Sequence, residues 1–137
     1  YAFTPNLTIQ GYAEPFASSG GFYNFGELTA PRSFDLRTYG TGGSTITPLP
    51  GGVYRVNDGL GTFSFFSGDF NVLSFRSNLV LRWEYLPGST LFVIWQQNRN
   101  DFLPVGSLVR PGSLWDATTA PGDNFFAIKL SYWISVK

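Results

Sequence analysis

Polar side chains recur at every second position in one stretch of the chain. Arg76, Asn78, Arg82 and Glu84 follow this spacing, and Val80 completes the series. Residues two apart in a β-strand point to the same face of a sheet, so these side chains would share one side. A polar row of this kind suits the lumen wall of a membrane β-barrel, and it equally suits the wet face of a soluble sheet.

The charges within this row have two interpretations. Arg82 and Glu84 can form a structural ion pair in a polar interior, which is the preferred interpretation, or they can take part in conduction or substrate passage. Lys129 lies on the polar side of a second alternating segment, and the same two interpretations apply to it. We therefore predict lumen-facing polar residues at Arg76, Asn78, Arg82, Glu84 and Lys129.

Three further carboxylates, Asp101, Asp116 and Asp123, lie among asparagines in a turn-rich stretch. Oxygen-rich loops can bind Ca²⁺, but the spacing matches no such motif, so ordinary Asx turns are preferred. The nine acidic residues could in principle supply a glycosidase-type pair, but nothing singles out two of them. We expect no catalytic residues, no cofactor and no metal site.

The composition excludes several classes of function. His, Cys and Met are absent, which removes disulfides, thiolate chemistry and imidazole catalysis. Lys+Arg and Asp+Glu number 9 each, so no net charge favours nucleic acid. No run approaches 18 consecutive apolar residues, so no transmembrane helix is expected.

The elements that must position the polar row are β-strands. The stretch from Asn78 to Gln96 is typical of a hairpin with a turn over 86–89, where Gly88 supplies the positive φ that a Pro-Gly turn needs. We predict an antiparallel pair formed by strands 72–85 and 90–97. Four apolar residues alternate with the polar row on the first strand: Leu79, Leu81, Trp83 and Tyr85.

Two more strands are expected, at about 6–16 and 125–136. Pro15 should end the first at about Phe16, since proline is confined to strand ends and unpaired edges. The last strand alternates strongly, with Lys129 on one face and an apolar set on the other: Phe126, Ile128, Leu130, Tyr132, Ile134 and Val136.

The remaining residues, 17–71 and 98–124, are expected to be two long, turn-rich loops, and no helix is expected in the first. The first should carry small sheets of its own, including a hairpin that joins strands 52–57 and 62–66 across Asp58–Gly61, with further strand candidates at 21–25 and 33–39. Loop aromatics could stack on sugars, although packing on one another is the commoner arrangement: Tyr23, Phe25, Tyr39, Tyr54 and Trp115.

Low charge (13%), many aromatics (18%) and strong alternation indicate an all-β, antiparallel protein. The apolar faces would be a core in a soluble β-sandwich and would contact lipid in a membrane barrel. Short and long connections alternate along the chain, as in outer-membrane barrels with short periplasmic turns and long extracellular loops. In that architecture Trp83, Tyr85 and Tyr132 would be interfacial aromatics.

Four spanning strands are too few for a closed barrel, because the smallest barrels have eight and an open edge leaves backbone groups unsatisfied in lipid. The chain also lacks an initiating Met and a signal segment. We therefore expect residues 1–137 to be one segment of a larger barrel, its C-terminal portion.

Three segments resemble a known family: PNLTIQGYAEPF at 5–16, SNLVLRWEYLPGSTLFVIWQQ at 77–97 and PGDNFFAIKLSYWI at 121–134. They are similar to the C-terminal end of an uncharacterised bacterial outer-membrane β-barrel family, whose members carry an N-terminal carbohydrate-binding-module-family-9-like domain. The hairpin is the most specific part of this resemblance. The resemblance implies an outer-membrane barrel, no known enzymatic activity and a possible link to glycans.

The leading hypothesis is a structural or transport component of a bacterial outer membrane, not an enzyme, with a polar lumen. Its expected partners are outer-membrane lipid and the remaining barrel strands or partner protein chains, with glycan as a further candidate and no nucleic acid. The alternative is a soluble β-sandwich that binds glycan or protein through aromatic loops.

Overall fold

A computed structural model of the chain describes residues 1–135, and β-strands dominate it. The chain divides into two compact units. The first contains Tyr1–Ala17, Leu73–Asp101 and Arg110–Lys137, and the second contains Ser18–Val72 and Phe102–Val109. The expected all-β, antiparallel class is confirmed.

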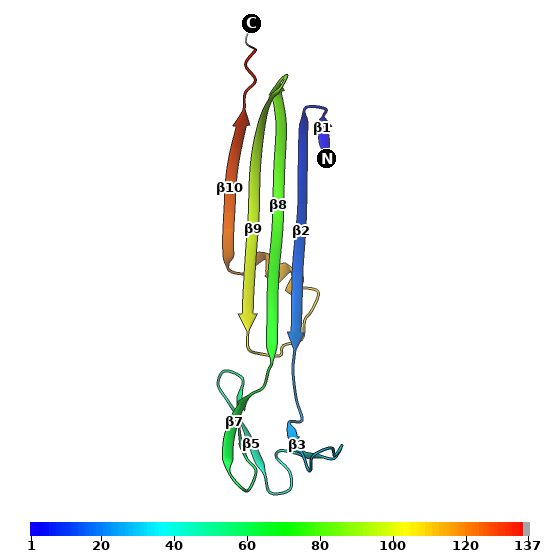
Figure 1. Cartoon of the computed structure of the whole chain (residues 1–137), viewed down its shortest axis with the longest axis vertical. Coiled ribbons are helices and arrows are strands. Elements are labelled where there is room, and N and C mark those ends of the chain that lie inside the picture. Colours follow the sequence, from blue (N-terminus) through cyan, green and yellow to red (C-terminus); the bar gives the residue numbers. More distant parts are fainter. Residues whose placement is uncertain (136–137) are drawn as a thin grey trace. The chain divides into compact units, whose positions relative to one another are not determined.

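Four long strands and one short strand form a single antiparallel sheet (Figure 1). Its strand order is β1-β2-β8-β9-β10. The sheet is open within residues 1–135, because β1 and β2 lie at one side and β10 at the other. The bounds are Ala2–Thr4 for β1, Leu7–Gly20 for β2, Phe70–Leu86 for β8, Ser89–Leu103 for β9 and Gly122–Ser131 for β10.

The expected hairpin is confirmed, since β8 and β9 are neighbours joined through Pro87 and Gly88. Gly88 has a φ of +76°, a conformation that a side chain bearing a Cβ rarely adopts. The Gly88 N–H donates to the Glu84 carboxylate at 3.2 Å, which holds the turn against the end of β8. Local sequence is therefore sufficient to specify this turn.

The register between β9 and β10 settles the orientation of β9, which has apolar side chains on both faces. Ten consecutive residue pairs run from Gly122 opposite Arg99 to Ser131 opposite Thr90. Directly opposed residues share a face, so Trp95 lies on the same face as its partner Phe126. By the same rule, Phe92 lies on the face of Lys129.

The sequence predicts that this strand ends at about Phe16. In the structure, β2 instead continues through Pro15 to Gly20. The Glu84 N–H donates to the Asn6 carbonyl on one side of β2, and the Ile9 N–H donates to the Tyr1 carbonyl on the other, both at 2.8 Å. Successive residues of a strand direct their backbone N–H and C=O groups to opposite sides. Pro15 is six residues after Ile9, so its backbone groups point to the same side as those of Ile9, away from β8. Its missing N–H therefore costs no bond to β8.

The later strand ends also differ from expectation. β9 extends to Leu103, and β10 begins at Gly122, because Asn98 and Arg99 pair with Asp123 and Gly122 despite their polar character. β10 ends at Ser131, and residues 132–135 are not in a strand. The expected strand end at Val136 lies outside the described residues.

The second unit contains the small sheets expected within 17–71, and the hairpin across Asp58–Gly61 is confirmed. The candidate at 21–25 is not a strand, and the candidate at 33–39 shrinks to three residues. The strand at Thr45–Leu49 is not predicted from the sequence, because Thr and Pro make up most of it. The elements are β3 (Gly26–Leu28), β4 (Leu36–Thr38), β5 (Thr45–Leu49), β6 (Val53–Asn57) and β7 (Thr62–Phe66).

The second unit has a small core on one face of the β5–β6–β7 sheet. Val56 is completely buried and pairs with Ile46 on β5 and Phe63 on β7. Tyr54 pairs with Phe65 on the same face. These cross-strand pairs explain why a Gly-rich segment still forms ordered structure.

A short helix, α1 (Ser113–Thr119), lies within 98–124, which the sequence predicts to be a turn-rich loop. Seven residues make about two turns, too few for an apolar period of 3.6 to stand out in the sequence. Ala117 on this helix is fully buried, so tertiary packing stabilises it. No helix of the described residues has the length and apolar character needed to cross a membrane.

Candidate functional site

One face of the five-stranded sheet carries the polar row of β8. Arg76, Asn78, Arg82 and Glu84 occupy alternate positions of this strand and therefore point the same way. Arg82 Nη2 donates to Glu84 Oε2 at 3.3 Å, so the structure brings this pair together. Both side chains are partly exposed, which limits the stabilisation from the ion pair to about 0–1 kcal/mol.

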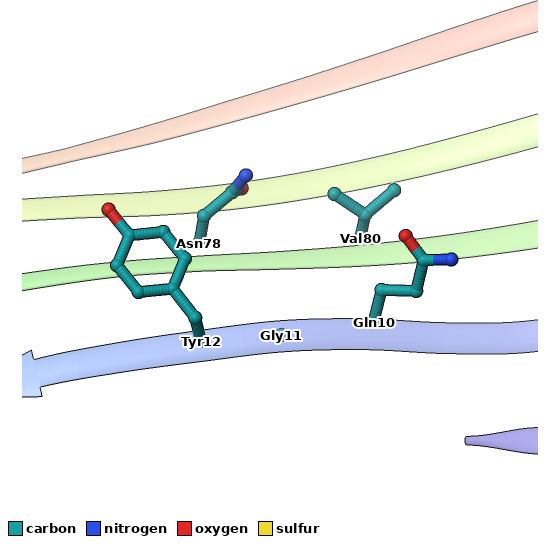
Figure 2. Close-up of a pocket in the computed structure, with 5 residues that line it drawn as sticks. All are labelled: Gln10, Gly11, Tyr12, Asn78 and Val80. Atoms are coloured by element: carbon teal, nitrogen blue, oxygen red, sulfur yellow. The ribbon is translucent and has the colours of Figure 1, made fainter.

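Residues from β2 and β9 join this row. Gln10 and Tyr12 of β2 line a shallow hollow of about 250 Å³ together with Asn78 and Val80 (Figure 2). Asn78 Oδ1 is buried there and has no hydrogen-bond partner within the described part of the chain. The hollow is therefore polar at its base.

A second hollow, of about 320 Å³, adjoins the first at Tyr12. It is lined by Arg76 of β8 and by Gln96 and Asn98 of β9. Gln10, Tyr12, Gln96 and Asn98 are absent from the residues predicted for this face. The alternation of β2 shows its own polar side, but only strand pairing reveals that this side continues the row of β8.

Lys129 completes the polar face at β10. It lies directly opposite Phe92, which shares a face with Gln96 because the two residues are four apart on β9. Lys129 and Arg76 therefore lie on one face of the sheet. We call this side of the sheet the polar face.

The opposite side, which we call the apolar face, is largely bare. A Cβ added to Gly11 of β2 would lie 2.9 Å from Leu79 Cδ1, which places these two residues on the same face. On β10 the side chains of Phe126, Ile128 and Leu130 are 67%, 75% and 65% exposed. Exposed apolar surface on this scale marks a face that contacts a protein or a membrane.

A polar boundary crosses the apolar face at one level. Ser77 Oγ donates to Gln97 Oε1 at 3.1 Å, and Gln97 Nε2 donates to Asn124 Oδ1 at 3.0 Å. Trp95 Nε1 donates to the same oxygen at 3.3 Å, while its ring stacks on Phe126 with centroids 5.7 Å apart. The Trp95 side chain therefore contacts a polar group through its indole N–H and an apolar ring through its face.

Aromatic side chains gather at the hairpin end of the same sheet. The rings of Trp83 and Tyr85 meet edge to face, 6.0 Å apart. The Tyr85 hydroxyl donates to the Ser131 carbonyl at 3.3 Å, so it lies next to Tyr132, which directly follows β10. The three aromatics predicted to be interfacial are thus neighbours, and Trp133 joins them through its N–H bond to Ser89 Oγ at 3.0 Å.

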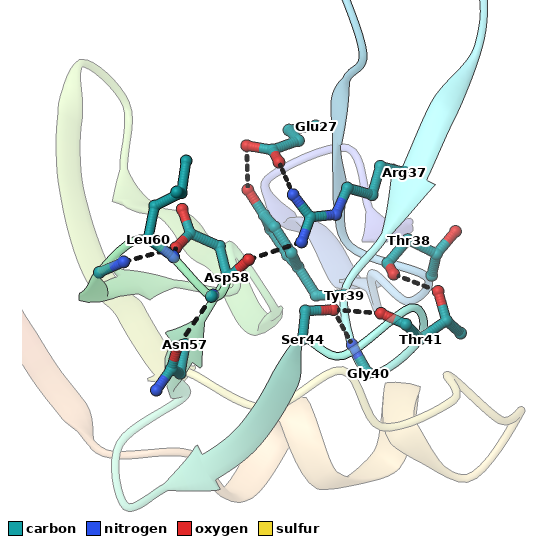
Figure 3. Close-up of polar contacts among 12 residues, drawn as sticks. Glu27, Arg37, Thr38, Tyr39, Gly40, Thr41, Ser44, Asn57, Asp58 and Leu60 are labelled. Carbon is teal, nitrogen blue, oxygen red and sulfur yellow. Dashed lines mark hydrogen bonds and ion pairs between the residues drawn. The ribbon is translucent and has the colours of Figure 1, made fainter.

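Polar contacts also organise the second unit (Figure 3). Arg37 forms an ion pair with Glu27 at 3.3 Å and donates to the Asp58 carbonyl. Partial burial, together with the neighbouring Glu27 carboxylate, raises the pKa of Tyr39. The Gly61 and Leu60 N–H groups donate to Asp58 Oδ1 at 2.7 and 2.8 Å and lower the pKa of Asp58.

Most loop aromatics named above as sugar-stacking candidates pack on one another. Phe25 contacts Tyr54, and Tyr39 contacts Phe63, with ring centroids 5.0 and 5.7 Å apart. Tyr23 and Trp115 remain exposed.

The loop carboxylates lie on three different elements: Asp101 on β9, Asp116 on α1 and Asp123 on β10. Within residues 1–135, no three His, Cys, Asp or Glu side chains come together as a metal-binding group. Comparisons with protein-family models, curated proteins and solved structures found no match.

Proposed function

We propose that this chain forms part of the wall of a β-barrel in a bacterial outer membrane, as a structural or transport component and not as an enzyme. The observation that carries the proposal is the bare apolar face, which opposes a polar face on the same strands. A membrane barrel needs this division, with lipid outside and water inside.

The exposed side chains would gain substantially from lipid contact. Moving one Phe, Leu or Ile side chain out of water stabilises a protein by about 1.5–3 kcal/mol. Phe126, Ile128 and Leu130 alone offer three such side chains on β10. A soluble sandwich would bury them under a second sheet, whereas these three side chains are 67%, 75% and 65% exposed.

Strand length also supports a spanning role. A tilted transmembrane strand needs about 9–11 residues. β10 has 10 residues, and the other long strands have 14, 17 and 15. All four long strands are therefore long enough.

Aromatic residues lie where interfaces would be expected. Trp83, Tyr85 and Tyr132 mark the hairpin end, and Trp95 marks the polar boundary further along the strands. Indole and phenol rings favour such positions because one side of the ring is apolar and the other is hydrogen-bonded. The short turn at Pro87–Gly88 would face the periplasm, and the long connections would be extracellular.

On this proposal the polar face lines the lumen. Arg76, Asn78 and Lys129, with the Arg82–Glu84 pair, would contact water or a passing solute, while outer-membrane lipid would cover the other face. Among the loop aromatics, the exposed rings of Tyr23 and Trp115 are the ones available for a role with glycans.

Adjacent residues on opposite faces of β8 allow a direct test. Leu81→Arg places a charge on the apolar face, and Val80→Arg places the same charge on the polar face. The purified chain and both variants are mixed with phospholipid vesicles and separated by flotation. We expect the parent chain and Val80→Arg to float with lipid, and Leu81→Arg to lose about 2–4 kcal/mol of membrane stability if the site is near the bilayer midplane. Equal behaviour of the two variants, or a parent chain that dissolves in detergent-free buffer, contradicts the proposal.

A further inference from the structure

The two outer strands of the sheet present long backbone edges. β10 pairs with β9 on one side, and no described strand lies on its other side. Nine of its ten residues are exposed, with only Ala127 partly covered. On β2, the short strand β1 pairs only with Leu7 and Thr8.

The uncovered part of β2 begins at Gln10. The bond from the Ile9 N–H to the Tyr1 carbonyl shows which positions of β2 point toward this edge. Gly11, Ala13 and Ala17 follow at the same alternation and present free backbone groups, whereas Pro15 presents only its carbonyl. Such an edge can accept another strand.

The two edges match in direction. Two antiparallel strands separate β2 from β10, so β2 and β10 run in opposite directions (Figure 1). β10 of one molecule can therefore lie antiparallel to β2 of another. The exposed stretch of β2 covers residues 10–16, whereas residues 17–20 are partly covered, so a second strand would lie along 10–16.

The two edges also match in chemistry. Glu14 lies on the polar face of β2, and Lys129 lies on the polar face of β10. Among residues 1–135 neither of them forms an ion pair. When Lys129 lies opposite Glu14, the apolar faces of the two molecules are continuous, and residues 127–131 of β10 run alongside the exposed residues 12–16 of β2.

We propose that β10 of one copy pairs with the open edge of β2 in a second copy, with Lys129 opposite Glu14. Two copies joined by two such seams would contribute eight long strands, the number in the smallest known membrane barrels. The inference rests on the proposed function, because in lipid the open edges have no water to satisfy them. A second copy is favoured as the occupant because the charge and the direction of the two edges are complementary.

The absence of cysteine from the sequence permits a clean cross-linking test. Glu14→Cys and Lys129→Cys chains are mixed in detergent micelles and oxidised. We expect a disulfide-linked species of twice the 15.2 kDa chain mass that disappears on reduction. The matched control is Thr8→Cys with Lys129→Cys, because Thr8 shares the polar face but is already paired with β1. A control that cross-links equally well overturns the register.

Charge reversal supplies an independent readout. In detergent, Glu14→Lys should shift the parent chain from dimer toward monomer by at least tenfold in the dissociation constant, and adding Lys129→Glu should restore the dimer. A parent chain that is monomeric in detergent overturns the inference. If that monomer still floats with vesicles, the proposed function stands, whereas loss of flotation is the separate failure of the proposed function.

Discussion

Trp95 and Phe126 lie opposite each other on β9 and β10, and their rings stack with a centroid distance of 5.7 Å and an interplanar angle of 6°. The stack lies where the apolar face meets the Ser77–Gln97–Asn124 hydrogen bonds. It joins an edge strand to the sheet at a point where few other side chains are buried. This pair therefore adds a side-chain contact to the ten residue pairs that join β10 to β9.

A double-mutant cycle should measure this contact. Trp95→Ala and Phe126→Ala should each destabilise the folded chain in detergent, and their coupling should be about 0.5–1.5 kcal/mol beyond the loss of buried area. Denaturant unfolding provides the free energies. Phe125→Ala, on the opposite face of β10, is the control and should show little coupling with Trp95→Ala. Strict additivity for Trp95 and Phe126 would contradict the stack.

The turn between β8 and β9 should be sensitive to substitution at Gly88. With φ at +76°, and with a new Cβ only 3.1 Å from Trp133 Cβ, Gly88→Val should cost about 1–2 kcal/mol or more. Gly61→Val is the control, because φ is not positive at Gly61 and the space around its Cβ is open. Chemical denaturation followed by circular dichroism measures both variants. A neutral Gly88→Val would show that another turn conformation is adopted.

Stability of the second unit should depend on Val56. The side chain is fully buried, and Val56→Ala removes two methyl-sized groups, which predicts a loss of about 2 kcal/mol. Val53→Ala is a matched control, because Val53 lies on the opposite face of β6 and is partly exposed. Hydrogen exchange of β5 to β7 amides reports on this unit directly. Equal effects at both positions would contradict the assigned core.

The Asp58 turn should weaken at acid pH. Two backbone N–H donors hold the pKa of Asp58 below its ordinary value of 3.8, so the folded turn favours the ionised carboxylate. The stabilisation of the turn by the ionised Asp58 carboxylate is complete above pH 3.8. It is lost as the pH falls through the pKa of Asp58 in the folded protein, which is below 3.8. NMR titration of the Leu60 and Gly61 amides should show a midpoint below 3.8. Asp58→Asn should abolish this titration, and a midpoint at or above 3.8 would contradict the turn.

Local sequence determined the parts of this protein that depend on a few neighbouring residues. The alternation at Leu79, Leu81 and Trp83 places apolar and polar side chains on opposite faces wherever the strand lies, because the side-chain period of a strand is two. Pro87 and Gly88 specify their turn through backbone conformation, together with the nearby Glu84 carboxylate. The Asp58–Gly61 connection is equally local, since Asp58 bonds to amides two and three residues later.

Long-range pairing decided what the sequence left open. Phe92 and Val93 are both apolar, so only the register with β10 assigns their faces. Pro15 continues β2 because its missing N–H points to an edge without a partner, and that edge is a property of strand order. α1 forms because Ala117 is buried. The sequence therefore determined the two-faced strands, while the tertiary structure decided which strands are neighbours and which edges remain open, since hydrogen bonds between strands join residues far apart in the chain.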